Sequence, residues 1–210
     1  MSNVFYRIKK ALGMLNHYYV RPDVGKFGSF GEKSTFSRPA DIKCAKNIYI
    51  GKNCRFGPKA TIMSVGNSRF IVKDNFGSAE GLTVITSTHI QEIGKLRTGG
   101  NEDNTYKDIV IEEDVWAGFN VTLLPGAYIG RGCILGAGAV IHTKIPPYSI
   151  VVGNPAKVIG FHFTPEEIIE HEKLLYPIED RIPKEVLIQN YQDYFLCRIK
   201  DIKKYMSIKI

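Results

Sequence analysis

Apolar positions recur every six residues along the second half of the chain, from Ile111 to Ile159. An α-helix advances by about 100° per residue, so a six-residue period cannot keep one apolar stripe. A plain amphipathic strand alternates every two residues, yet the third position of each hexad mixes charged, aromatic and small residues. First positions hold Ile111, Ala117, Leu123, Ile129, Leu135 and Ile141, and fifth positions hold Val115, Val121, Ala127, Cys133 and Ala139. The six-residue period therefore excludes both an α-helix and a plain amphipathic strand.

A short strand and a corner in every hexad satisfy the pattern. Three hexads would close one triangular coil of about eighteen residues. Residues one coil apart would then stack about 4.8 Å apart, with backbone hydrogen bonds between coils. The predicted stacked pairs are Ile111 with Ile129, Ala117 with Leu135, Leu123 with Ile141, and Val115 with Cys133. The sequence therefore predicts an all-β repeat core with an aliphatic interior.

A weaker form of the repeat precedes this stretch and begins near Ile42–Ile50. Its clearest hexads start at Ile50, Phe56 and Ile62. The preceding segment, from Arg21 to Lys46, is rich in Gly, Ser and Pro, and we expect an irregular lead-in there. The predicted organisation is therefore an N-terminal arm (1–40), a repeat domain (41–160) and a C-terminal helical cap (161–210).

The repeat stops at Thr86–His89 and restarts at Ile109. Polar residues and glycines fill the interval, so residues 89–108 are predicted to be a loop that leaves the coil. Loops of this length in a compact domain are usually functional or disordered. His89 stands at the base of this loop.

Both ends of the chain carry helical signals. Near the N-terminus, one apolar face is formed by Val4, Phe5, Ile8, Ala11, Leu12 and Leu15. We expect this short face to pack against the protein's own body, with contact to a membrane surface as the less favoured alternative. At the other end, Thr164, Pro165 and Glu167 predict a capped helix to about Leu175, and Ile182–Ile210 predicts one or two more. These helices would cover the open end of the coil.

Composition limits the remaining possibilities. The chain has 210 residues, 44% of them hydrophobic. No apolar segment is long enough to span a bilayer and no signal peptide is evident, so we expect a cytoplasmic protein. The net charge of +7 favours anionic partners, but no basic run with interleaved aromatics indicates nucleic acid. Cys54 and Cys133 fit buried positions of the repeat better than a disulfide or a nucleophile.

Three segments of the second half resemble the hexapeptide-repeat acyltransferases. They are Trp116-Ala117-Gly118-Phe119, Gly136-Ala137-Gly138-Ala139 and Gly153-Asn154-Pro155-Ala156-Lys157. The resemblance covers roughly Ile42–Phe163 and implies a left-handed parallel β-helix with an extended loop after His89. The handedness rests on the resemblance alone, because parallel crossovers ordinarily favour the right-handed sense.

The same resemblance implies a catalytic role for His89. In the sugar and xenobiotic branch of this family, a histidine at the base of such a loop is the catalytic residue. An imidazole is suited to take the proton of a hydroxyl while that hydroxyl attacks an acetyl thioester. We therefore expect direct transfer from acetyl-CoA without an acyl-enzyme and without a metal.

The donor site implied by the resemblance lies in the second half of the repeat. Small residues would let the pantetheine arm approach the backbone, and Lys157 could meet a nucleotide phosphate. The carry-over of His142 and Thr143 is only partial, because relatives have a polar and a basic residue there. The expected coenzyme-contacting residues are Trp116, Gly118, Phe119, Ala137, His142, Thr143 and Lys157.

Several functions stay open on this basis. Family members pack three β-helices side by side with the active site between two of them, which implies a homotrimer. The favoured function is acetylation of a hydroxyl of a sugar or polysaccharide precursor, with nucleotide-sugar amine or antibiotic acetylation as variants. A non-catalytic β-helix that serves as an assembly module is the alternative of another class. A hydratase of the carbonic anhydrase type needs three metal-binding histidines on this fold. Only His89 and His142 lie within the repeat, so this function is set aside.

Overall fold

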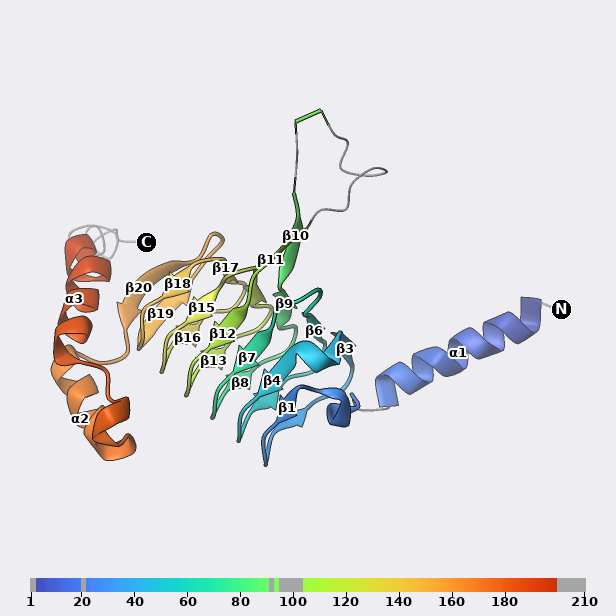
Figure 1. The fold of residues 1–210 in the computed structure, drawn as a ribbon, viewed down its shortest axis with the longest axis horizontal. Coiled ribbons are helices and arrows are strands. Elements are labelled where there is room, and N and C mark those ends of the chain that lie inside the picture. The colour runs from blue at the N-terminus through green and yellow to red at the C-terminus, as the bar shows by residue number, and fades with distance from the viewer. Residues whose placement is uncertain (1–2, 20–21, 91–92, 95–103, 200–210) are drawn as a thin grey trace, which may run out of the picture.

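The body of the protein is a parallel β-solenoid with three faces (Figure 1). The computed structural model describes residues 3–19, 22–90, 93–94 and 104–199. The first face consists of β1 (Ser29–Phe30), β4 (Ile48–Ile50), β7 (Phe70–Val72), β12 (Ile109–Ile111), β15 (Tyr128–Ile129) and β18 (Lys144–Ile145). The second consists of β2 (Thr35–Phe36), β5 (Arg55–Phe56), β8 (Gly77–Ser78), β13 (Trp116–Ala117), β16 (Ile134–Leu135), β19 (Ser149–Val152) and β20 (Lys157–Phe161). The third consists of β3 (Ala40–Lys43), β6 (Ala60–Met63), β9 (Thr83–Ile85), β14 (Thr122–Leu123) and β17 (Val140–Ile141).

The register between coils confirms the hexad reading. Strands one coil apart pair in parallel, and the aligned residues are those expected from the sequence: Ile111 with Ile129, Ala117 with Leu135, and Leu123 with Ile141. Two- to four-residue strands suffice because each one is hydrogen-bonded to a coil on either side. The architecture is the one expected, that of the left-handed parallel β-helix.

The first coil starts earlier than the sequence suggested. β1, β2 and β3 pair with β4, β5 and β6, so the segment read as an irregular lead-in is a regular coil. Phe30, Phe36 and Ile42 are spaced by six and continue the repeat. Two of them, Phe30 and Phe36, carry aromatic rings where the repeat from Ile111 onward has aliphatic side chains. The solenoid therefore includes residues before the expected boundary at position 41.

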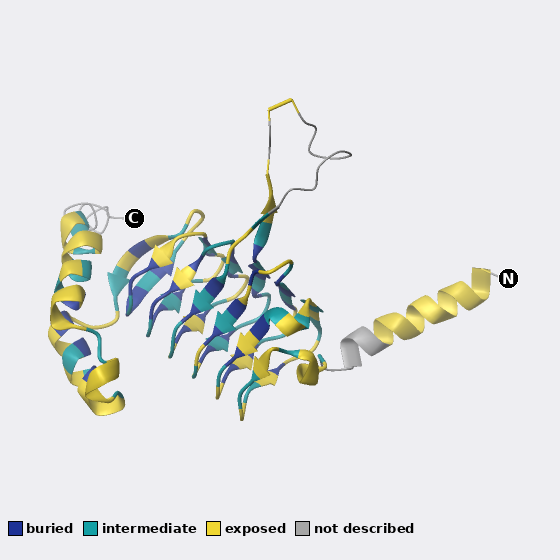
Figure 2. Ribbon diagram, in the orientation of Figure 1, coloured by how far each residue is buried: buried dark blue, intermediate teal, exposed yellow. Residues whose placement is uncertain are grey.

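The interior is a continuous apolar column, and Figure 2 shows buried positions along the strands that enclose it. First- and fifth-position side chains of the clean repeat from Ile111 to Ile141 are all buried, whereas Phe30, Ala40 and Ile42 of the first coil are partly buried. At the N-terminal end, Phe36 stacks on Phe56 with ring centroids 4.1 Å apart, and Phe76 follows 5.1 Å further. Cys54 and Cys133 are buried free thiols, as expected. Burial raises the pKa of Cys133 to about 11, which keeps this thiol protonated and unreactive.

The C-terminal end of the column is covered. β20 turns back antiparallel on β19, and α2 (Pro165–Leu175) and α3 (Lys184–Tyr194) follow (Figure 1). Thr164 caps α2 in a capping box with Glu167, as predicted. Short 3₁₀ turns occupy Val24–Lys26, Ala45–Asn47, Ile178–Asp180 and Leu196–Arg198. Residues 200–210, where more helix was expected, lie outside the described part of the chain.

The N-terminal helix α1 (Asn3–Tyr19) forms as predicted but does not pack as predicted. It projects from the first-coil end of the solenoid, away from the body (Figure 1). Its apolar residues between Val4 and Leu15 are exposed (Figure 2). The expectation that this face is buried against the protein is therefore wrong. Of the helices that the structure describes, none has the length and apolar character needed to cross a bilayer.

Candidate active site

His89 lies on a two-stranded arm that leaves the solenoid. The arm consists of β10 (Ser87–His89) and β11 (Asn104–Tyr106), which pair antiparallel with His89 opposite Asn104. It departs after β9, where the chain passes from the third face back to the first; we call this corner the return edge. The His89 side chain is exposed. The loop expected at 89–108 is thus partly a hairpin, and residues 91–92 and 95–103 lie outside the described part of the chain.

The start of the arm is fixed by buried hydroxyl groups. Thr86, three residues before His89, is completely buried, and its hydroxyl oxygen lies 2.6 Å from that of Ser68. The same oxygen accepts a hydrogen bond from the Val65 backbone N–H at 3.2 Å. Since buried hydroxyl groups are costly unless paired, this cluster holds the root of β10 in one position.

The return of the arm is fixed by an ion pair that sequence reasoning missed. The Asp108 carboxylate accepts hydrogen bonds from the Arg69 backbone N–H at 2.7 Å and from its guanidinium at 2.6 and 2.9 Å. Partial burial raises the pKa of Asp108, but these bonds outweigh it and hold the pKa below its usual value. Arg69 directly precedes β7 and Asp108 directly precedes β12, so the two residues occupy equivalent positions of the repeat. Their opposite charges at these positions were the sequence signal that could have predicted the ion pair.

Two of the expected donor-site residues line one hollow near the return edge. Thr143 and Lys157 border a space of about 260 Å³ together with Lys144 and residues of α3. The Arg198 guanidinium reaches the same place and donates to the Val158 carbonyl. Three basic side chains and one carboxylate, that of Asp193, surround the hollow. His142 precedes Thr143 and is exposed at the same edge.

Three further donor-site residues meet at a different corner, between the second and third faces. Gly118, Phe119 and Ala137 lie on adjacent coils there. The Phe119 carbonyl accepts a bond from the Gly138 N–H at 2.8 Å. A Cβ on Gly118 would come within 2.9 Å of the Ala137 nitrogen. Coil stacking is therefore sufficient to explain the glycine at this position, without any contact to a ligand. The Gly118 N–H donates to Leu135 at 2.8 Å and belongs to the ladder.

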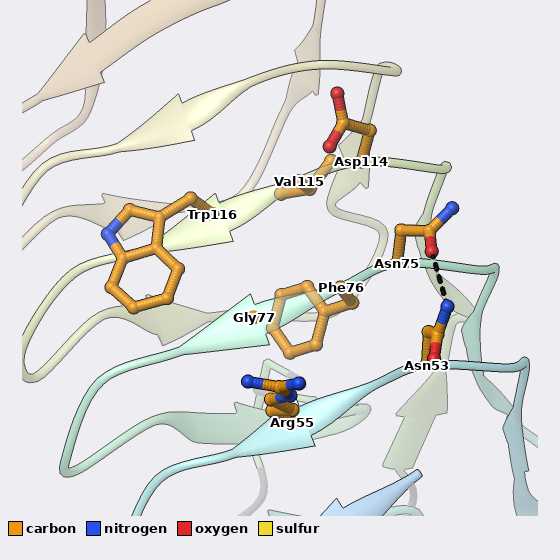
Figure 3. A pocket seen from close by; sticks show the side chains of 8 residues that line it. All are labelled: Asn53, Arg55, Asn75, Phe76, Gly77, Asp114, Val115 and Trp116. Atoms are coloured by element: carbon orange, nitrogen blue, oxygen red, sulfur yellow. Dashed lines mark hydrogen bonds between the residues drawn. The ribbon is translucent and has the colours of Figure 1, made fainter. Parts of the chain in front are cut away.

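Trp116 lies on the second face, where Figure 3 shows its indole beside a shallow hollow. The hollow measures about 370 Å³ and is also lined by Arg55, Gly77 and Asp114. A Cβ on Gly77 would meet the indole ring at 2.7 Å, so the indole occupies the space above this glycine. Burial raises the pKa of Asp114 at the rim.

Within one chain, the expected residues therefore form separate groups. The arm with His89 and the hollow of Thr143 and Lys157 lie along the return edge, whereas Gly118, Phe119 and Ala137 lie at another corner and Trp116 lies on a face. Successive coils are about 4.8 Å apart along the solenoid axis. The end of β17 lies two coils beyond the root of the arm, so the two are about 10 Å apart along that axis. Among the described residues, no group of three His, Cys, Asp or Glu side chains could hold a metal ion.

Comparisons with known proteins bear on the repeat. Residues 108–143 match the family model described as bacterial transferase hexapeptide (six repeats). A Schizosaccharomyces pombe protein with the provisional name of acetyltransferase is 34% identical over 119 residues, which are 57% of this chain and 52% of that protein. The chain thus spans about half the length of the curated relatives it matches.

Solved structures bear on the fold. A hexapeptide-repeat acetyltransferase from Vibrio cholerae in complex with acetyl coenzyme A superposes with a TM-score of 0.61 at 23% identity, covering 76% of this chain and 90% of that one. A galactoside acetyltransferase in complex with coenzyme A superposes with a TM-score of 0.62 at 24% identity, covering 84% and 88%. Residues 108–143 thus carry a hexapeptide repeat, and the chain shares the fold of these hexapeptide-repeat and galactoside acetyltransferases.

Proposed function

We propose that this protein transfers the acetyl group of acetyl-CoA to a hydroxyl of a sugar or polysaccharide precursor, with His89 as the general base. The observation that carries the proposal is the exposed His89 on an arm anchored at both of its roots. The names of the relatives and of the solved structures support the reaction class. The four free cysteines are in keeping with a cytoplasmic location.

The reaction needs one group that can accept and return a proton. The acceptor hydroxyl is a poor nucleophile while neutral, and the imidazole of His89 takes its proton as the oxygen attacks the thioester carbonyl. Collapse of the tetrahedral intermediate breaks the C–S bond. The departing sulfur receives the proton from the imidazolium, so the products are an acetyl ester and free coenzyme A. His89 ends in its starting state, and no acyl-enzyme forms.

The hollow at the return edge suits the nucleotide end of coenzyme A. Lys144, Lys157 and Arg198 surround it, and phosphate groups bind where several cations converge. We place the donor's phosphates against Lys157 and Thr143. The pantetheine arm would then run between two copies of the chain, past the small residues Gly118 and Ala137 at the coil corner of the second copy.

The active site would be completed by a second copy of the chain. In one copy the arm points away from the body (Figure 1), and the expected donor residues lie at two corners and on one face. A homotrimer with the active site between neighbouring solenoids would bring one copy's His89 to the donor groove of the next. Light scattering of the purified protein tests the trimer directly.

The test of the function is thiol release from acetyl-CoA in the presence of a panel of sugars, amino sugars and antibiotics. We expect sugar-dependent turnover that falls by about 10²–10⁴-fold in His89→Ala. His162→Ala, which removes an exposed histidine outside the solenoid, is the matched control and should turn over normally. Full activity of His89→Ala would refute the mechanism. If no acceptor releases thiol and coenzyme A does not bind, the protein is instead a non-catalytic assembly module.

A further inference from the structure

The exposed face of α1 is unusual for a helix attached to a folded domain. The relative exposures of Val4, Phe5, Ile8, Leu12 and Leu15 lie between 53% and 76%. At 100° per residue, these five side chains fall within an arc of about 100° on the helix surface. Such a continuous apolar stripe needs a partner, because isolated helices of this length are marginal in water.

The charges of α1 indicate which partner fits. On the same helical projection Arg7 lies about 60° beyond one border of the stripe, Lys9 lies about 40° beyond the other, and Lys10 lies on the opposite side. The chain contains no acidic residue before Asp23. A helix with an apolar stripe flanked by cations matches a bilayer surface, where the stripe enters the acyl boundary and Lys and Arg reach anionic headgroups.

We propose that α1 lies in the plane of an anionic lipid bilayer and attaches the first-coil end of the solenoid to it. The helix is 17 residues long, which corresponds to about 25 Å along the surface. It projects from the end opposite to α2 and α3, so the attached end is the one far from the C-terminal cap (Figure 1).

A second copy of the chain fits α1 less well. Leu12 and Leu15 belong to a pattern that resembles a coiled-coil seam, but the helix holds only about two heptads, and stable seams extend over more. Helices packed together would also bring Arg7, Lys9 and Lys10 of each copy close to one another, with no carboxylate on α1 to pair with them. A bilayer rich in anionic lipid supplies the missing negative charge.

The experiment is co-sedimentation of the full chain with vesicles. Vesicles of phosphatidylcholine with phosphatidylglycerol should bind the wild type, and vesicles of phosphatidylcholine alone should bind it far less. Replacing Arg7, Lys9 and Lys10 together by Gln should weaken binding to the anionic vesicles on the order of 100-fold. Raising the salt concentration should also weaken binding to the anionic vesicles, because salt screens the attraction between the charges.

Two neighbouring substitutions test the stripe itself. Leu12→Gln places a polar group in the stripe and should weaken vesicle binding by about tenfold or more. Gly13→Gln introduces the same side chain on the polar side of the helix, where the position is open to solvent, and should leave binding unchanged. Neither position lies in the proposed active site, so acetyl transfer to a soluble acceptor should be unaffected.

Three outcomes would overturn the proposal. The first is failure of the wild type to sediment with anionic vesicles. The second is equal binding by Leu12→Gln and Gly13→Gln. The third is a loss of oligomer mass in Leu12→Gln without any vesicle binding by the wild type, which would assign α1 to contacts between copies.

Discussion

The C-terminal cap depends on one buried carboxylate, that of Glu172 on α2. It is 1% exposed and accepts hydrogen bonds from the Tyr148 hydroxyl at 2.6 Å and the Ile182 N–H at 2.9 Å. The Arg131 guanidinium donates to both of its oxygens at 3.1 and 3.2 Å. Burial and the bond to Glu172 raise the pKa of Tyr148. The cap is therefore fastened to the solenoid by a charged network.

Replacing Glu172 by Ala leaves buried groups without their partner. Breaking a buried ion pair from one side costs about 3–5 kcal/mol. Arg131 keeps Glu113 at 3.2 Å and the Asp180 carbonyl at 2.9 Å, so we expect a cost near the lower limit, about 3 kcal/mol. For a chain of this size that corresponds to a fall in Tm of about 6–12 °C.

Thermal unfolding followed by circular dichroism measures the effect. Glu170→Ala is the matched control on the same helix, since it removes an exposed pair with Lys173 worth at most about 0.5 kcal/mol. If the Tm of Glu172→Ala stayed within about 2 °C of the wild type, the network would not hold the cap and the reasoning from burial would be wrong.

Three further predictions follow from the site. Lys157→Ala should weaken coenzyme A binding by about 1.5–3 kcal/mol in calorimetry, with Lys184→Ala as the exposed control, and an unchanged Kd would move the donor groove elsewhere. The pKa of Asp108 is lowered in the folded protein, so its contribution to the arm is complete above about pH 4 and is lost as the pH falls through the lowered value. Amide exchange of β10 and β11 should therefore accelerate only at acid pH in the wild type, and already at neutral pH in Asp108→Asn. Gly118→Ala should lower the free energy of unfolding by about 1–3 kcal/mol, because its Cβ would meet backbone of the next coil, and an unchanged urea midpoint would contradict that packing.

The repeat made the core predictable from sequence. A period of six fixes which side chains point inward, and the pairs named in advance, such as Leu123 with Ile141, are the pairs that stack. The first coil escaped notice because Phe30 and Phe36 are aromatic and their neighbours are glycine and serine. The capping box of α2 was readable because its chemistry is local.

The surroundings of the site were less predictable. The anchor between Arg69 and Asp108 joins residues 39 positions apart, and the only sequence signal for it was their equivalent position directly before two first-face strands. The free apolar face of α1 could not be deduced either, since a stripe of apolar residues predicts burial without saying against what. Trp116 and Lys157 line two different hollows of one chain, and residue spacing in the sequence does not predict such a separation.

The position of the arm between two stacked strands has a consequence for how its length could change. β12 stacks directly on β7, with Ile109 over Phe70, as though the intervening segment were absent. The packing of the core therefore does not depend on the length of the segment between β9 and β12. Doubling the length of such a loop costs only about 0.6 kcal/mol in closure entropy. An insertion or deletion between Thr86 and Asp108 should therefore leave every coil beneath in its place.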